Sequence, residues 1–312
     1  MIKQNLVDKL QAWGFEDGFL IFKDFSLGAI LELRPRDIST ATDELLNSLH
    51  GLTCDFLNGL KDPLSVQFVQ VIDRGVGTTL ERHEALLEPT APVLAEQLLR
   101  ERIQKIRSLD DDGQIPNQKL YLVLRRPFVR SAKRERRLRL WEKKDEGQEW
   151  AKSTLEPEVK LFRQVLESTK KGLETLGILV QTLPESAVFE ILFDQWNPGH
   201  PVEGVNFNRE DIRDDLLLND LVVSTKGFML GQYHHRVVSL KIMPEQTFAS
   251  MSERLRELPF DSRLLLTCDV LDQGREDLVL QTQRRISYAM YAGKRGVSDL
   301  ESAAKLSDIE SV

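Results

Sequence analysis

The chain has 312 residues, 41% hydrophobic and 29% charged, which is enough apolar content for a folded core. Its formal net charge of −7 argues against nucleic-acid binding over the whole surface, and no apolar run is long enough to cross a membrane. Two cysteines, Cys54 and Cys268, make no disulfide framework, and the charged start of the chain does not resemble a signal peptide, so we expect a cytoplasmic protein.

The first 75 residues predict a hairpin, a helix and a strand. The apolar positions of residues 2–13 fall on one helical face. Residues 19–23 and 27–33 predict two antiparallel strands, with Ser26 and Gly28 at a tight reversal. A helix is expected from about Asp37, with Asp37 or Ser39 as its N-cap. Residues 64–72 alternate in polarity, which predicts a partly buried strand.

The middle of the chain alternates between helical and strand patterns. The expected order is a helix (89–109), a loop (110–118), a strand (119–127), a basic segment, a flexible connection (143–150), a helix (155–176), a short strand (178–184) and a helix (185–193). Residues 194–204 are rich in Pro and Gly and form the best candidate domain boundary.

After this boundary the pattern of the first half returns. Residues 221–224 and 236–242 predict a second hairpin with a turn at 226–231, and Pro244 begins a helix. Residues 262–272 predict a strand, and a long helix begins at Gly274.

Both halves therefore follow the order ββαβα. The strand endings also match, with Ile-Asp-Arg-Gly at 72–75 and Leu-Asp-Gln-Gly at 271–274. We predict an α+β fold of two ferredoxin-like units with mostly antiparallel sheets, in lobes 1–200 and 205–312. The alternative is chance recurrence, because a hairpin plus a helix is a common way to cover one sheet face.

The usual signatures of catalysis and of cofactor or metal binding do not stand out. The Gly-Lys of residues 293–294 lacks the glycine and hydroxyl spacing of a phosphate-binding loop. The adjacent His234 and His235 would point to opposite faces of a strand, so they would not share a metal. Cys54 and Cys268 are interpreted as buried thiols. We therefore predict no catalytic, cofactor-binding or metal residue.

The basic segment 125–144 is the strongest chemical feature. It holds ten Lys or Arg residues against two Glu, a net +8, which leaves −15 for the rest of the chain. Three interpretations stay open: a solvated or partner-facing segment, contact with a protein partner or anionic lipid headgroups, and nucleic-acid binding. The candidate contact residues are Arg130, Lys133, Arg134, Arg136, Arg137 and Arg139.

In order along the chain, several passages resemble the N-terminal region of the TraC-type conjugation ATPases of type IV secretion systems. They are "GFEDGFLIFKDFSLGAILELRP" with Gly28, Glu32, Leu33 and Pro35, then Val66-Gln67-Phe68, then "YHHRVVSLKIMPEQT" and "DVLDQGREDLVLQTQRR". Members of this family continue into a RecA-like domain with Walker motifs, whereas this sequence ends at Val312 without them. Either a truncated N-terminal domain or a separate protein of that shape would account for this, and no nucleotide-binding residue is carried over.

The resemblance implies a non-catalytic docking and assembly domain at the cytoplasmic face of the bacterial inner membrane. Its expected partners are inner-membrane proteins of the secretion channel and other copies of itself, with peripheral membrane contact. The chain itself is then not an enzyme, and ATP and magnesium belong to the RecA-like domain of its parent. The alternative is a nucleic-acid-binding protein that acts through residues 125–144.

Overall fold

The computed structural model describes residues 6–38, 40–61, 63–75, 93–111, 115–127, 146–200, 205–239, 260–271 and 278–285, with the single residues 80, 84, 258, 274 and 276. Its helices are η1 (Val7–Lys9), α1 (Asp43–Asn58), α3 (Val93–Asp111), α5 (Glu146–Thr175) and α6 (Glu185–Trp196). Its strands are β1 (Ala12–Glu16), β2 (Phe19–Phe22), β3 (Leu27–Arg34), β4 (Leu64–Arg74), β5 (Pro116–Arg126), β6 (Leu179–Thr182), β7 (Leu221–Ser224), β8 (Gly227–Leu230), β9 (Tyr233–His235) and β10 (Ser262–Val270).

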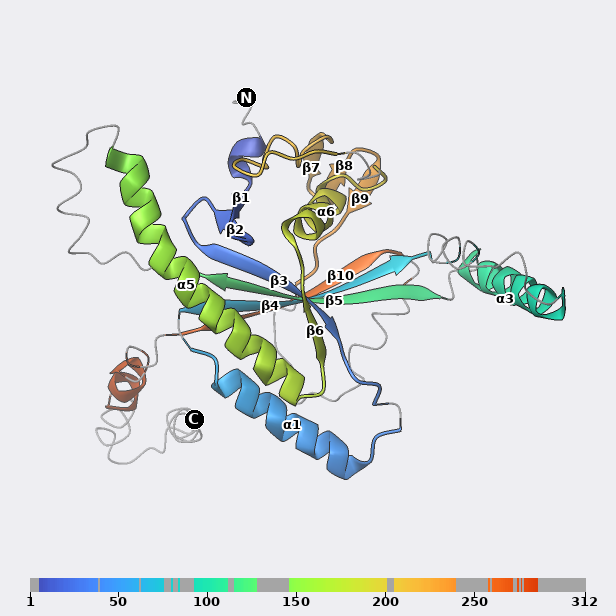
Figure 1. Cartoon of the computed structure of the whole chain (residues 1–312), viewed down its shortest axis with the longest axis horizontal. Coiled ribbons are helices and arrows are strands. Elements are labelled where there is room, and N and C mark those ends of the chain that lie inside the picture. Colours follow the sequence, from blue (N-terminus) through green and yellow to red (C-terminus); the bar gives the residue numbers. More distant parts are fainter. Residues whose placement is uncertain are drawn as a thin grey trace, which may run out of the picture.

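A seven-stranded antiparallel sheet forms the centre of the molecule (Figure 1). Its order is β1-β2-β3-β5-β4-β10, and β6 pairs with β3. The start of β3 pairs with β2, at Leu27 and Gly28, and residues 31–34 pair with β6. This confirms the predicted α+β class with mainly antiparallel sheets.

One face of the sheet is covered by α5, with α1 beside it (Figure 1). Phe162 of α5 is fully buried and meets Phe19 edge to face, with ring centroids 5.0 Å apart. Burying one such side chain stabilises the fold by about 1.5–3 kcal/mol. Gly172 allows α1 to approach α5, since a Cβ there would lie 2.8 Å from Cδ2 of Phe56.

The opposite face is covered by α6 and residues 205–218. Phe189 of α6 stacks on Phe207 with centroids 4.4 Å apart, and both belong to the second apolar cluster. Asn197, fully buried, fixes the covering segment, because its Nδ2 donates to the carbonyls of Phe193 and Leu216 at 3.0 and 2.9 Å. Its Oδ1 accepts from the Leu218 amide at 2.8 Å, so none of its hydrogen-bonding groups is left unsatisfied.

The same segment covers the β1 edge of the sheet. The Phe15 amide donates to the Arg209 carbonyl at 2.8 Å, and the Ile212 amide donates to the Trp13 carbonyl at 2.8 Å. Gly14 lies between these bonds, where a Cβ would come within 2.5 Å of the Glu210 carbonyl oxygen. Only glycine permits this approach of two backbones.

Strands β7, β8 and β9 form a separate antiparallel sheet beside α6 (Figure 1). Tyr233 of β9 packs against the turn after α6, so that a Cβ on Gly199 would lie 2.5 Å from its hydroxyl oxygen. Helix α3 belongs to the connection between the neighbouring strands β4 and β5, and lies beyond the end of the sheet (Figure 1).

The structure does not show two ferredoxin-like units. Strand β10, which the sequence assigned to the second unit, pairs with β4 of the first in unbroken register from Ser262↔Ile72 to Val270↔Leu64. The range 205–312 therefore contributes a strand to the sheet built mostly by residues 1–200. The two strand endings that looked equivalent belong to antiparallel neighbours, so they lie at opposite ends of that strand pair.

Several local predictions are also corrected. Trp13, expected on a helical face with residues 2–10, belongs to β1, and residues 227–230, expected as a turn, form β8. Gly28, expected in the turn, lies inside β3, where a Cβ would come within 2.6 Å of the Phe22 ring. In the turn itself, Phe25 has the positive φ, at 64°. The first helix begins at Asp43 with Thr42 as its N-cap, well after Asp37.

The long helix and the boundary region also differ in their limits. α5 begins at Glu146, inside the segment 143–150 that was expected as a flexible connection, and continues through Pro157. Residues 110–111 belong to α3, and β5 begins at Pro116, which shortens the expected loop. α6 extends to Trp196, three residues beyond the predicted end.

Candidate partner-binding site

The six predicted contact residues lie outside the described part of the chain. They are Arg130, Lys133, Arg134, Arg136, Arg137 and Arg139. The structure does describe the first two cations of the basic segment, Arg125 and Arg126, at the end of β5. These two residues and Pro127 are the only part of the segment that the structure describes.

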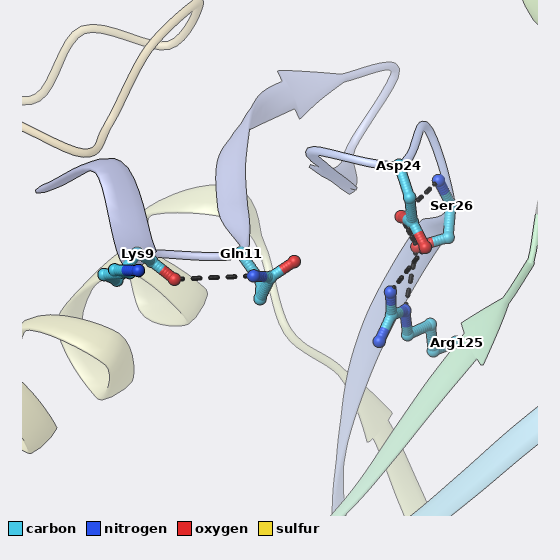
Figure 2. A network of polar contacts seen from close by, with 5 residues as sticks. All are labelled: Lys9, Gln11, Asp24, Ser26 and Arg125. Atoms are coloured by element: carbon cyan, nitrogen blue, oxygen red, sulfur yellow. Dashed lines mark hydrogen bonds and ion pairs between the residues drawn. The ribbon is translucent and has the colours of Figure 1, made fainter.

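Arg125 is held by the turn between β2 and β3 (Figure 2). Its Nε donates to the Ser26 hydroxyl oxygen at 2.8 Å, and its Nη2 donates to Oδ2 of Asp24 at 2.7 Å. Ser26 in turn donates to Oδ1 of Asp24 from its amide at 3.0 Å and from its hydroxyl at 2.6 Å. The guanidinium also lies over the Phe22 ring, 4.6 Å from its centroid.

Electrostatics favour the charged form of Asp24 in this network. Partial burial raises the pKa of Asp24, but the hydrogen bonds from Ser26 and the charge of Arg125 outweigh it. The net result is a pKa below the usual 3.8.

Arg126 points to the opposite face of β5, where it forms an ion pair with Glu158 of α5. The arginine side chain is mostly buried in this pair. Two of the ten cations of the segment are thus matched by carboxylates of the fold, which leaves eight in residues 130–144. The described start of the basic segment is therefore anchored to both the β2–β3 turn and α5.

The second exposed feature is β10, which forms the other edge of the main sheet. Of the strands that the structure describes, only β4 pairs with it. Its central residues Leu264, Leu265 and Leu266 are 38%, 55% and 51% exposed, although leucine is normally buried. Leu264 and Leu266 lie on the α5 face and Leu265 on the α6 face, as their β4 partners Gln70, Phe68 and Val69 indicate.

The residues of β10 themselves carry few of the features that usually protect an edge strand against pairing. Within β10 there is no proline, lysine or bulge, and its register with β4 is continuous over nine residue pairs. The only charged residues in the strand are Arg263 and Asp269, near its two ends, and both are exposed.

A group of ionisable side chains lies beside the start of β10. Burial and the charge of Asp261 raise the pKa of Asp73, whereas Arg263 lowers it by a smaller amount. Burial and the nearby carboxylates raise the pKa of Tyr121 to about 12, so its phenol stays protonated at neutral pH. Burial and the charge of Arg263 lower the pKa of His235, which stacks on Phe228 with centroids 4.9 Å apart.

The cysteines and possible metal ligands in the described part of the chain do not assemble into a second site. Cys54 is exposed, not buried as expected, and its Sγ lies 3.8 Å from Nε2 of His50 on the same helix. Cys268 is half-buried on β10. Within the described ranges, no group of three or more His, Cys, Asp or Glu side chains is arranged to hold a metal ion.

Of the helices in the described ranges, none combines the length and the apolar character that crossing a bilayer requires.

The chain matches no family model and no curated protein.

Sequence reasoning found the basic segment but missed the exposed β10 edge. The sequence predicted only a strand over residues 262–272, and a run of three leucines is in general more typical of an interior strand than of an edge. Strand order decides whether such a run is central or at an edge, and the pattern within one strand does not contain that order.

Proposed function

We propose that this chain is a docking and assembly domain of a TraC-type secretion ATPase. In this proposal it positions the motor at inner-membrane proteins of a type IV secretion channel, on the cytoplasmic side, and associates with other copies. The observation that carries the proposal is the exposed, apolar β10 edge of the main sheet, where leucines on both faces are exposed among the described residues.

An edge of this kind supports an interaction role for a physical reason. The backbone N–H and C=O groups on the outer side of an edge strand can pair with another strand, and the adjacent side chains then choose the partner. Leu264, Leu265 and Leu266 would lose apolar exposure on pairing, which favours association by roughly 25 cal/mol per Å² buried.

The basic segment supports a position near the membrane. Eight further cations follow in the sequence after the anchored Arg125 and Arg126. A cluster of this size is attracted to anionic lipid headgroups or to an acidic partner, by about 1 kcal/mol per cation near the surface.

Recruitment to membrane vesicles tests the proposal. The purified chain is mixed with inverted inner-membrane vesicles from cells that do or do not produce a type IV secretion channel, and the vesicles are floated. We expect the chain to float preferentially with the channel-containing vesicles. Equal binding to both preparations, or none, would contradict the docking role.

A charge-reversal variant tests the contribution of the basic segment. We expect R134E/R136E/R137E to weaken vesicle binding, while a matched reversal of three exposed lysines elsewhere, K105E/K160E/K171E, leaves it largely intact. If the first variant instead abolishes a steeply salt-dependent binding to DNA and leaves vesicle binding unchanged, the nucleic-acid alternative is supported. Tight stoichiometric ATP binding by residues 1–312 would contradict a non-catalytic domain.

A further inference from the structure

The β10 edge carries charge and apolar patterns that are complementary to themselves. An antiparallel strand pair related by a twofold axis places residue i of one strand opposite residue j of the other, with a constant sum of i and j. If the axis passes through Leu266, Arg263 of one copy lies opposite the partner's Asp269. Symmetry makes the same pair again at the other end.

The apolar residues match in the same register. Leu266 meets the partner's Leu266 at the axis, and Leu264 meets the partner's Cys268, all on the α5 face. On the other face, Leu265 meets the partner's Thr267, whose hydroxyl accepts from Nε2 of Gln67 at 2.8 Å in each copy. The three exposed leucines are thus all placed within the shared part of the sheet.

Neighbouring registers that keep the faces aligned lose this match. With the axis at Leu265, Asp269 would lie opposite the partner's Asp261, which is a like-charge pair. With the axis at Thr267, Asp269 would lie opposite the partner's Leu265, and Arg263 opposite the partner's Leu271. The register centred on Leu266 is the one of these three that joins opposite charges.

We infer that the β10 edge binds a second copy of this chain, forming a symmetric dimer in which the two main sheets continue through an antiparallel β10–β10 pair. A nine-residue pair of this kind forms about eight to ten backbone hydrogen bonds. The inference rests on the proposed assembly function and names the strand and register that would mediate self-association.

A charge exchange tests the register with the full chain. We expect wild-type protein to dimerise with concentration in light scattering, and D269R to weaken dimerisation roughly tenfold or more, because two opposite-charge pairs become like-charge pairs. R263D should do the same. An equimolar mixture of the two variants should form a heterodimer, since one copy then presents two acidic residues and the other two basic ones.

Disulfide trapping provides a test that does not depend on changing charge. In a C54S background, L264C places a thiol opposite the partner's Cys268, at a Cα separation of about 4.5–5.5 Å that suits a disulfide. We expect mild oxidation to give a covalent dimer. The matched variant L265C lies next to it on the opposite face and should give little cross-linking.

Several results would overturn the inference. They are a wild-type chain that stays monomeric at all concentrations, a D269R dimer as tight as wild type, or equal cross-linking of L264C and L265C. If the chain is monomeric but still floats with channel-containing vesicles, and D269R abolishes this binding, the β10 edge binds a channel protein rather than a second copy. A dimer without vesicle recruitment would instead leave the inference intact and contradict the docking function.

Discussion

The two edges of the main sheet differ in how they are protected. At the β1 edge, residues 209–212 cover the strand, with hydrogen bonds to Trp13 and Phe15 on either side of Gly14. At the β10 edge, β4 is the only described strand that pairs with the edge strand, and three consecutive leucines are exposed. One edge is therefore covered by residues 209–212 of the same chain. Because unprotected apolar edges tend to pair with other strands, the exposed leucines of the other edge point to an interaction there.

The largest expected loss of stability comes from removing Asn197, whose hydrogen bonds hold the segment that covers the β1 edge. Asn197→Ala removes two hydrogen bonds that hold residues 216–218 to the end of α6 and a third to Phe193 within the helix, and it takes a donor from the carbonyl of the buried Leu216. We expect a loss of roughly 2–4 kcal/mol in the free energy of unfolding, measured with urea. The exposed Asn58→Ala at the end of α1 is the matched control and should change little.

A smaller but more local effect is expected at the backbone contact itself. Gly14→Ala forces a Cβ against the Glu210 carbonyl, so we expect a loss of about 1–3 kcal/mol and faster amide exchange at Phe15. Gly51→Ala on α1 meets nothing within 4 Å and should be neutral or slightly stabilising. If both alanines had the same effect, the close approach at Gly14 would not be what closes this edge.

Substitution on the open edge should separate stability from association. Leu266→Lys replaces a side chain that is 51% exposed, so we expect the unfolding free energy of the monomer to change by no more than about 0.5 kcal/mol. Dimerisation should be lost, because the two lysines would meet at the symmetry axis. Light scattering and urea unfolding on the same preparation distinguish these effects, and a large loss of stability would show that the edge is already packed.

The anchor of the basic segment predicts a modest dependence on pH. The folded-state pKa of Asp24 is lowered, so its charged form contributes stability above the usual value of 3.8 and loses it as pH falls through the folded pKa. Because Asp24 is exposed, Asp24→Asn should cost only a few tenths to about 1 kcal/mol near neutral pH. The difference from wild type should vanish in acid, as thermal unfolding across pH would measure.

The smallest effect has the opposite sign and lies beside the open edge. Burial and Asp261 raise the folded-state pKa of Asp73, so its contribution is present below 3.8 and is lost as pH rises through the folded pKa. Asp73→Asn should therefore raise the melting temperature slightly at neutral pH and match wild type in acid. A variant that is less stable at neutral pH would contradict this assignment of the pKa shift.

The sequence predicted individual elements better than their pairing. Strand β4 and helix α6 were found because local periodicity determines them. The pairing of β4 with β10 joins segments nearly 200 residues apart, and nothing in either segment specifies its neighbour. Strand β1 was missed because its sequence has no strong alternating pattern. It is defined by its pairing with β2 and by the close approach of Arg209 and Glu210.

The candidate site was predictable to a similar extent. Composition identified the basic segment, but the roles of Arg125 and Arg126 as anchors depend on Asp24 and Glu158, which are distant in sequence. The exposed edge required knowledge of strand order. Physical patterns within one segment therefore identified charge, whereas exposure and complementarity became visible only in the folded sheet.

Hydrogen exchange of the two edge strands at increasing protein concentration tests the central claim most directly. We expect β1 peptides to be protected at every concentration, because residues 209–212 of the same chain cover them. Peptides from β10 should exchange readily when dilute and become protected as the chain dimerises. Exchange of β10 that does not change with concentration, while β1 remains protected, would contradict the assignment of β10 as the assembly edge.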